Sequence, residues 1–264
     1  MTVIGCLALL VGHNVQGEAG KVLPIAMENY PPFEFEQEGK IVGFTTEIVA
    51  QVLERLGYSP DIKNLPWSRA ETMVKGGHIA AIYSLVKNSE REQYYYFSDP
   101  LCTVTNYFFK LKKNEIQWQS MDDLKDYSVG ISQGYQYAPE FMQAIKGNLF
   151  KRVDKIAGNN LELRHLRRLK YGLVDLSICS LSVCQYLIKT HAPEFDMIDY
   201  IDNPVGNTRL YYIGFSKQWP GAEELVAQFN AELEKFVAEG KRAAIFEKYG
   251  VADPFKQSSI RSTE

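Results

Sequence analysis

The chain has 264 residues, enough for one large domain or two lobes of ordinary size. Hydrophobic residues make up 45% and charged residues 23%, which is ordinary for a globular protein. The formal net charge of −3 provides no basic footprint for nucleic acid. Four histidines are scattered without the spacing of metal ligands, so we expect no metal, no cofactor and no nucleic-acid partner.

The N-terminus departs from this composition. Residues 3–11 form an apolar run that is too short to span a bilayer, and small and polar residues follow it up to Gly20. This pattern is typical of a secretory signal, so residues 1–20 are interpreted as a signal-like segment that directs the chain to the periplasm. The alternative is an N-terminal tail without structure. We expect no transmembrane helix in the later sequence.

Strands and helices alternate in the first part of the chain. Residues 22–27 read as a strand, and apolar residues at helical spacing predict a helix from Phe44 to Leu56, capped by Thr45 or Thr46. A second helix is expected over 67–75, a buried strand over 79–83 and an extended run over 107–111.

A second alternating block follows. It contains predicted strands over 127–131, 174–178 and 197–201, a helix capped by Asn160, and another helix over 181–189. A strand over 210–215 and a long amphipathic helix after Pro220 complete the chain. The alternation favours α/β architecture with parallel sheets. Because no Pro/Ser-rich linker is present, the extended segments 107–111 and 205–210 are the candidates for joining two lobes.

Arg91 carries a fixed positive charge directly after the predicted strand 79–83. Its guanidinium has the planar set of donors that suits a carboxylate. Ligands of open α/β sheets bind beyond the carboxyl ends of the strands, so Arg91 lies where a small anionic ligand would be held. The alternative is a surface arginine in an ordinary ion pair.

Four cysteines are present, and removal of Cys6 with a signal segment would leave three. An odd count argues against a full disulfide framework. Cys179 and Cys184 are close enough in sequence to pair in an oxidising compartment. The reading that we favour is that both are small, unpaired core residues.

The order of several motifs resembles the family 3 extracellular solute-binding proteins, the periplasmic type that binds amino acids. The resemblance runs from about Val22 to Gly250. It is carried by Tyr30-Pro31-Pro32-Phe33, Gly43-Phe44, Trp67, Ser89-Glu90-Arg91 with Phe97-Ser98-Asp99-Pro100, Asp123-Leu124, Gly134, Gly172-Leu173-Val174-Asp175 and Gly214-Phe215-Ser216-Lys217.

This resemblance implies a two-lobed periplasmic-binding-protein fold, the type II Venus flytrap, with two hinge strands. We expect lobe 1 to comprise residues 21–108 and 207–264, and lobe 2 to comprise residues 109–206. A small carboxylate-bearing ligand would bind between the lobes, and closure would deliver it to the membrane subunits of an ABC transporter. The protein would be a periplasmic monomer without catalytic residues.

The resemblance also implies a set of ligand-binding residues. Arg91 matches the arginine that grips a ligand carboxylate, and the aromatic rings of Tyr30, Trp67, Tyr135 and Tyr137 could line the cleft. The full prediction for ligand contacts is Arg91, Tyr30, Trp67, Ser84, Asn88, Gly134, Tyr135, Gln136 and Ser180.

One departure from the family concerns the ligand's amino group. The family usually places an aspartate just after the strand 174–178, whereas this chain reads Cys179-Ser180-Leu181. An ammonium in a desolvated cleft needs a counter-charge, and Ser180 supplies only a neutral acceptor. A small carboxylate, or an amino acid gripped by another acid such as Glu28, therefore fits better than a standard mode of amino-acid binding.

Two alternatives share the same fold. One is an enzyme similar to cyclohexadienyl dehydratase, for which Glu28, Glu34 and Glu71 would be the nearest acid or base candidates. The other is a sensory module that reports its ligand to a separate membrane partner.

Overall fold

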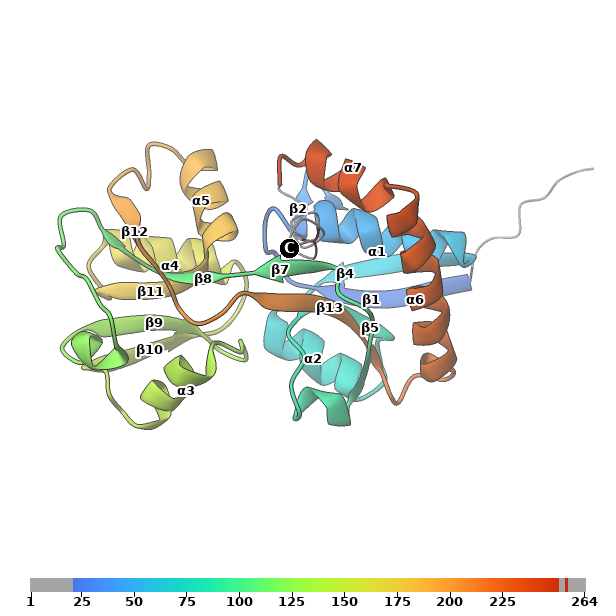
Figure 1. Ribbon diagram of the computed structural model, residues 1–264, viewed down its shortest axis with the longest axis horizontal. Helices are drawn as coiled ribbons and strands as arrows, with labels where there is room; N and C mark the ends of the chain where they lie inside the picture. Colours follow the sequence, from blue (N-terminus) through green and yellow to red (C-terminus); the bar gives the residue numbers. More distant parts are fainter. Residues whose placement is uncertain (1–20, 252–254, 256–264) are drawn as a thin grey trace, which may run out of the picture.

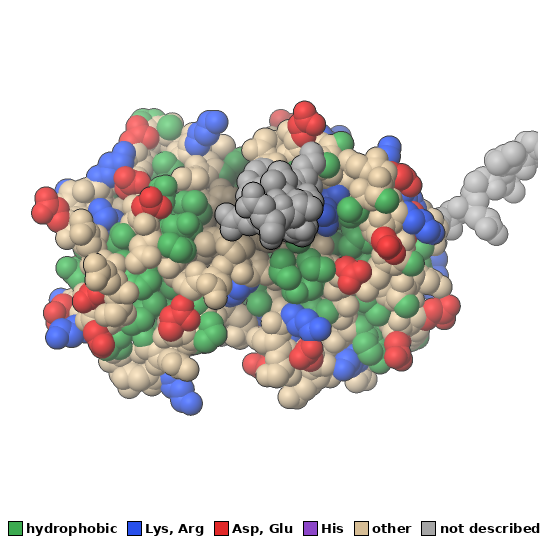
Figure 2. Space-filling view, in the orientation of Figure 1, with side chains coloured by type: hydrophobic (Ala, Val, Ile, Leu, Met, Phe, Trp, Pro, Cys, Tyr) green, Lys and Arg blue, Asp and Glu red, His purple; other side chains and the backbone are tan. Residues whose placement is uncertain are grey.

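A computed structural model describes residues 21–251 and residue 255. The predicted signal segment, with Cys6, lies outside the described residues. The described chain forms two lobes that lie side by side along the long axis of the molecule (Figure 1). On the face shown in Figure 2, acidic and basic side chains intermingle over both lobes.

Lobe 1 is built on a mixed sheet in the order β4-β1-β5-β13-β6, with β7 also paired to β13. Strands β4 and β5 run parallel to β1, whereas β13 runs antiparallel to β5, β6 and β7. Its elements are β1 (Lys21–Met27), β2 (Phe35–Gln37), β3 (Lys40–Val42), α1 (Phe44–Arg55), β4 (Tyr58–Asn64), α2 (Trp67–Lys75), β5 (Ala81–Leu85), the 3₁₀ turn η1 (Arg91–Gln93), β6 (Tyr95–Phe97), β7 (Cys102–Val104), β13 (Arg209–Ser216), α6 (Ala222–Ala238) and α7 (Lys241–Lys248).

Strand β1 shows why this sheet is covered on both faces. Successive side chains of a strand point to opposite faces. Leu23 and Ile25 pack into the same core as α1, α6 and α7, whereas Ala26 packs with Trp67 and the rest of α2 on the other face. Strands β4 and β5 pair with the two edges of β1, and the carboxyl end of β1 points toward the second lobe (Figure 1).

Lobe 2 contains a five-stranded mixed sheet in the order β10-β9-β11-β8-β12. Helices α4 and α5 share one core with Phe109, and α3 shares the other with Phe108, its neighbour on β8. The elements of lobe 2 are β8 (Asn106–Leu111), the 3₁₀ turn η2 (Met121–Leu124), β9 (Ser128–Ser132), α3 (Pro139–Lys146), β10 (Arg152–Ile156), α4 (Leu161–Lys170), β11 (Leu176–Ser180), α5 (Leu181–Thr190) and β12 (Ile198–Pro204).

The chain crosses between the lobes twice, and the two crossings lie next to each other. The first runs from β7 to β8 through Thr105, and the second from β12 to β13 through residues 205–208. The hydroxyls of Thr105 and Thr208 are 2.7 Å apart, and the Val205 N–H donates to the Asn106 carbonyl at 2.8 Å. Two short adjacent strand links provide a natural hinge.

Several details differ from the sequence-based expectations. The sheets are mixed rather than parallel, because β13 and β8 return antiparallel into them. Residues 107–111 belong to β8 inside lobe 2, so they do not join the lobes. Thr45 and Thr46 are buried inside α1, whose N-cap residue is Gly43, and neither threonine caps the helix.

No helix within the described ranges is long and apolar enough to cross a membrane. The lobe bounds 108/109 and 206/207 stay a prediction. The two sheets themselves change over between Val104 and Asn106 and between Pro204 and Arg209.

Candidate functional site

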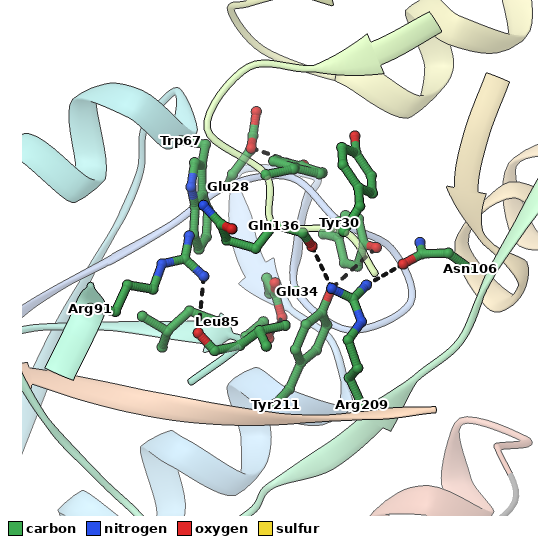
Figure 3. A pocket seen from close by; sticks show the side chains of 14 residues that line it. Glu28, Tyr30, Glu34, Trp67, Leu85, Arg91, Asn106, Gln136, Arg209 and Tyr211 are labelled. Atoms are coloured by element: carbon green, nitrogen blue, oxygen red, sulfur yellow. Dashed lines mark hydrogen bonds between the residues drawn. The ribbon is translucent and has the colours of Figure 1, made fainter. Parts of the chain in front are cut away.

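A narrow cavity lies between the lobes, beside the two crossings (Figure 3). It has a volume of about 40 Å³ for the centres of water-sized molecules, room for on the order of three waters. In this conformation the lobes are therefore nearly closed on each other. The lining residues come from both lobes and from the hinge: Glu28, Tyr30, Glu34, Trp67, Ser84, Leu85, Val86, Arg91, Asn106, Tyr135, Gln136, Tyr137, Arg209 and Tyr211.

Arg91 begins the turn η1 and is only 3% exposed. Its Nε donates to the Glu71 carboxylate at 3.0 Å, and its Nη1 donates to the Val86 carbonyl at 3.0 Å. Nη2 reaches across to the Gly134 carbonyl of lobe 2 at 3.4 Å. A guanidinium has five N–H donors, so two of them are left for a ligand. The Trp67 ring, 5.4 Å away, holds the plane of the group.

Arg209 is a second guanidinium at the same cavity, and it starts the hinge strand β13. It donates to the Gln136 carbonyl of lobe 2 and to the side-chain oxygen of Asn106, which begins β8. The arginine thus fastens both crossings to the loop that follows β9. Figure 3 shows Arg91 and Arg209 reaching into the cavity from different sides.

Ser84 and Glu34 form a buried pair in the floor of the cavity. Ser84 has a φ of 59°, a left-handed conformation that non-glycine residues seldom adopt. The register between β5 and β13 shifts at this point, and the Ser84 hydroxyl donates to Glu34 at 2.6 Å. Burial raises the pKa of Glu34 well above its ordinary value, against the opposing effect of the Ser84 hydrogen bond.

Glu28 follows β1 directly and is 3% exposed. Burial, with the nearby Glu162 carboxylate as a second cause, raises the pKa of Glu28 to about 8. The Tyr135 hydroxyl of lobe 2 donates to Glu28 Oε2 at 3.0 Å and opposes this shift. Glu28 Oε1 is buried and accepts no hydrogen bond from any described residue.

Aromatic rings close the cavity between the lobes. The ring centroids of Tyr135 lie 6.2 Å from Tyr30 and 5.9 Å from Trp67, both in edge-on contacts. The Tyr211 hydroxyl donates to that of Tyr30 at 3.3 Å. The indole N–H of Trp67 is buried and has no acceptor within the described part of the chain. It is a donor that a ligand oxygen could use.

Of the nine predicted contact residues, six line the cavity: Arg91, Tyr30, Trp67, Ser84, Tyr135 and Gln136. Gly134 does not line the cavity, and its carbonyl accepts a hydrogen bond from Arg91 Nη2. Asn88 lies behind Arg91, where its Oδ1 accepts the Arg91 backbone N–H at 2.8 Å. Ser180 does not line the cavity; it ends β11 as the N-cap residue of α5, and its hydroxyl contacts that of Ser182 at 3.1 Å.

Sequence reasoning missed Arg209, Asn106 and Tyr211, which all come from the hinge strands. The segment 205–210 was predicted as a possible connection between the lobes. The one sequence signal for Arg209 was therefore a positive charge in a segment expected to border the cleft. Glu28 and Glu34 were considered as acids near the cleft, and both line the cavity. Glu71 does not line it and instead pairs with Arg91.

The expectation that Cys179 and Cys184 are unpaired is wrong. They form a disulfide, with their Cα atoms 6.3 Å apart. It joins the end of β11 to the first turns of α5, and both residues are buried, as expected for core positions. The apolar residues around the two cysteines correctly indicated that both side chains are buried. Whether their sulfur atoms can bond depends on the turn between β11 and α5, which the sequence does not reveal. Within the described residues, no group of three or more potential ligands could hold a metal ion.

The sequence pattern of the bacterial extracellular solute-binding proteins, family 3, matches residues 23–252. The chain belongs to this family. The protein is therefore a solute-binding protein, and the family resemblance predicted from its motifs is confirmed. The two-lobed fold predicted with it is confirmed as well.

Curated relatives cover nearly the whole chain. The L-cystine-binding protein TcyJ of Escherichia coli (strain K12) is 26% identical over 92% of this chain and 87% of TcyJ. The L-cystine-binding protein TcyA of Bacillus subtilis (strain 168) is 25% identical over 86% of this chain and 81% of TcyA.

Solved structures share the fold at low identity. An ancestral arginine-binding protein bound to arginine superposes with a TM-score of 0.76 and 24% identity, covering 88% of this chain and 99% of the other. A histidine kinase sensor domain with similarity to periplasmic binding proteins gives a TM-score of 0.77 and 20% identity over 89% and 97%. These likenesses bear on the fold alone.

Proposed function

We propose that this protein captures a small solute bearing a carboxylate, an amino acid or a close relative of one, in the cavity between its lobes. The observation that carries the proposal is the presence of two guanidinium groups, those of Arg91 and Arg209, at one cavity between the lobes. They come from segments far apart in sequence, and each still has N–H donors left for an anion. The Trp67 indole N–H adds a neutral donor.

Delivery to an ABC importer follows from the same proposal. Several relatives are named as amino-acid-binding proteins, and one solved structure of the same fold belongs to work on glutathione import through the cystine ABC importer of Streptococcus mutans. The protein would act in the periplasm as a monomer, exported by its N-terminal segment. A solute held between two closed lobes is presented to a membrane partner only in the closed form, which supports one-way delivery.

A thermal-shift screen tests the binding proposal. The panel contains the twenty common L-amino acids, L-cystine and small mono- and dicarboxylates. A ligand at 100 times its Kd stabilises the folded form by about 2.7 kcal/mol, which for a chain of this size raises Tm by about 5–10 °C. If no compound shifts Tm and mass spectrometry finds no solute released on denaturation, the proposal is wrong.

An enzyme on the same fold is the second candidate, and one observation favours it. Glu28 lines the cavity and burial raises its pKa to about 8, a property that suits a general acid or base at neutral pH. Turnover of a prephenate-like substrate, abolished by Glu28→Gln, would establish this candidate. Binding of a solute without turnover would favour the first.

A further inference from the structure

Two buried carboxyl groups from opposite lobes meet at Tyr135. Glu28 follows β1 of lobe 1, and Glu162 lies in the first turn of α4 in lobe 2; they are 3% and 5% exposed. One oxygen of each, Oε1 of Glu28 and Oε2 of Glu162, is buried without a hydrogen-bond partner in the described chain. The Tyr135 hydroxyl donates its single proton to Glu28 Oε2 and lies within reach of Glu162, and its proximity lowers the pKa of both groups against the larger, raising effect of burial.

Within residues 21–251, no hydrogen bond or ion pair joins a cationic side chain to either carboxyl group of this pair. Arg91 and Arg209 line the cavity with Glu28, whereas Glu162 lines a second pocket beside Asn29 and Asn160. The hydrogen bonds found among the described residues direct the two arginines to Glu71, to Asn106 and to backbone carbonyls. A buried carboxyl oxygen without a partner is unfavourable, and two ionised carboxylates facing each other are more so. The two carboxyl groups therefore lack a positively charged partner among the residues that the structure describes.

We infer that Glu28 and Glu162 form the subsite for a primary ammonium group of the ligand, with one carboxylate contributed by each lobe. This rests on the proposed function and narrows it to solutes that carry both an ammonium and a carboxylate. An ammonium is a compact cation with three donors, which suits single oxygens approaching from two sides. A planar guanidinium would instead require a paired set of acceptors on one carboxylate.

Because one carboxylate of the subsite comes from each lobe, a bound ammonium would hold the lobes together, and its binding would depend on pH. Without a ligand, burial raises the pKa of Glu28 to about 8 and that of Glu162 to about 7, so the pair holds protons at pH 6 that it loses as the pH rises to 8 and above. Binding of the ammonium requires the ionised forms, so the carboxylic acid proton passes to the buffer as the ion pair forms. Affinity for an amino acid should therefore rise between pH 6 and pH 8.

Other titratable or charged groups face this pair, and they contribute to its field. On the cavity side these are Glu34, Arg91, Arg209, Tyr30, Tyr135, Tyr137 and Tyr211, and on the outer side of Glu162 they are Glu36 and His191. Glu34 is the alternative carboxylate that could bind the ammonium. Its Oε2 already accepts from Ser84, so it offers less to a new donor.

The first experiment compares matched probes that differ only in the amino group. L-cystine is paired with dithiodipropionate and L-glutamine with glutaramate, and other hits of the amino-acid panel are paired with their des-amino acids. We expect the amino acid that binds to do so about 10-fold or more tightly than its des-amino partner. Equal affinity within a pair would overturn the subsite and leave the proposed function intact. Failure of the whole panel, with no co-purifying solute, would instead overturn the proposed function.

The second experiment uses the variants Glu28→Gln and Glu162→Gln with the amino acid that binds. Each should lose about 10-fold or more in affinity and lose the rise between pH 6 and pH 8, while the des-amino probe is bound as before. The control is Glu54→Gln, because Glu54 is exposed on α1 far from the cavity. Both subsite variants keep a neutral side chain of the same shape, and their folding is checked by thermal unfolding. A flat pH profile in the parent protein, or loss of affinity only on Glu34→Gln, would overturn the assignment.

Discussion

The two lobes contribute different chemistry to one cavity. Lobe 1 supplies ionisable side chains, with Glu28 directly after β1, Glu34 directly before β2 and Arg91 in η1. The loop of lobe 2 after β9 supplies two tyrosine rings and the backbone carbonyls of Gly134 and Gln136. This division indicates that lobe 1 determines which solute is held, and that lobe 2 encloses it.

The groups that join the lobes support this comparison. Tyr135 donates to Glu28, and Arg91 donates to the Gly134 carbonyl, so each contact pairs an ionisable side chain of lobe 1 with a group of the lobe 2 loop. Glu162 is the exception, because it brings a charge from lobe 2. Changes in lobe 1 should therefore affect affinity more than changes in the loop of lobe 2.

The largest effect is expected for Arg91→Ala. Loss of a charged hydrogen bond to a ligand carboxylate removes about 1.5–3 kcal/mol, which is about 10-fold or more in affinity. Calorimetric titration of the bound solute measures it. Arg69→Ala is the control, because Arg69 is exposed on α2. Unchanged affinity in Arg91→Ala would show that Arg91 does not bind the solute, and would contradict the proposal that lobe 1 determines specificity.

The next effect concerns the stability of the ligand-free protein. The pKa of Glu28 is raised from 4.5 to about 8, so the folded state keeps a proton that the unfolded state loses as pH rises. Stability is therefore undiminished below about pH 4.5 and declines as pH rises toward and through 8. Glu28→Gln should avoid this loss and be more stable than the parent by about 2 kcal/mol at pH 8, with little difference at pH 4.5.

Calorimetric unfolding at the two pH values, without ligand, checks this prediction. For a chain of this size the difference at pH 8 corresponds to a Tm higher by about 4–8 °C in the variant. Glu54→Gln serves again as the exposed control. A variant that is equally stabilised at both pH values would show that packing, and not the buried charge, is responsible.

A smaller effect is expected for Tyr135→Phe on the side of lobe 2. The ring stays to contact Trp67 and Tyr30, and only the hydroxyl that donates to Glu28 is lost. Removal of one hydrogen bond should reduce affinity by about 0.5–1.5 kcal/mol, less than for Arg91→Ala. A larger loss than that of Arg91→Ala, measured by the same titration, would reverse the proposed division between the lobes.

The smallest effect is expected at the outer edge of the cleft. Asn29 of lobe 1 donates to the side-chain oxygen of Asn160 of lobe 2 at 2.9 Å, in an exposed position. Since water can replace an exposed partner, Asn29→Ala should change affinity by less than about 1 kcal/mol. Dissociation rates from stopped-flow fluorescence, with Asn160→Ala as the reciprocal variant, would reveal whether this contact instead controls opening.

Much of the fold could be predicted from the sequence where local patterns carry it. The helix 67–75 and the helix that begins at Leu181 have clear amphipathic periodicity and punctuation, and both are present as α2 and α5. Strand β4 was missed because Tyr58–Asn64 lies at a sheet edge and contains Pro60 and charged residues, which are unusual in a strand. Its pairing with β1 is a tertiary property.

The candidate site was predictable to a similar extent. Arg91, Tyr30 and Trp67 follow predicted elements and belong to recognisable motifs, so sequence could assign them. Arg209 could not be found this way, because its place depends on two crossings that come together from positions about a hundred residues apart in the chain. Ser84 was among the predicted contacts and lines the cavity, but its left-handed backbone conformation has no signal in the sequence.

The most direct test of the central claim is native mass spectrometry of the protein with the solute that binds best in the screen. We expect one solute per chain in the parent protein and in Arg69→Ala, and a largely empty protein for Arg91→Ala at the same solute concentration. Equal occupancy in Arg91→Ala and the parent protein would contradict a site between the lobes that is anchored by Arg91.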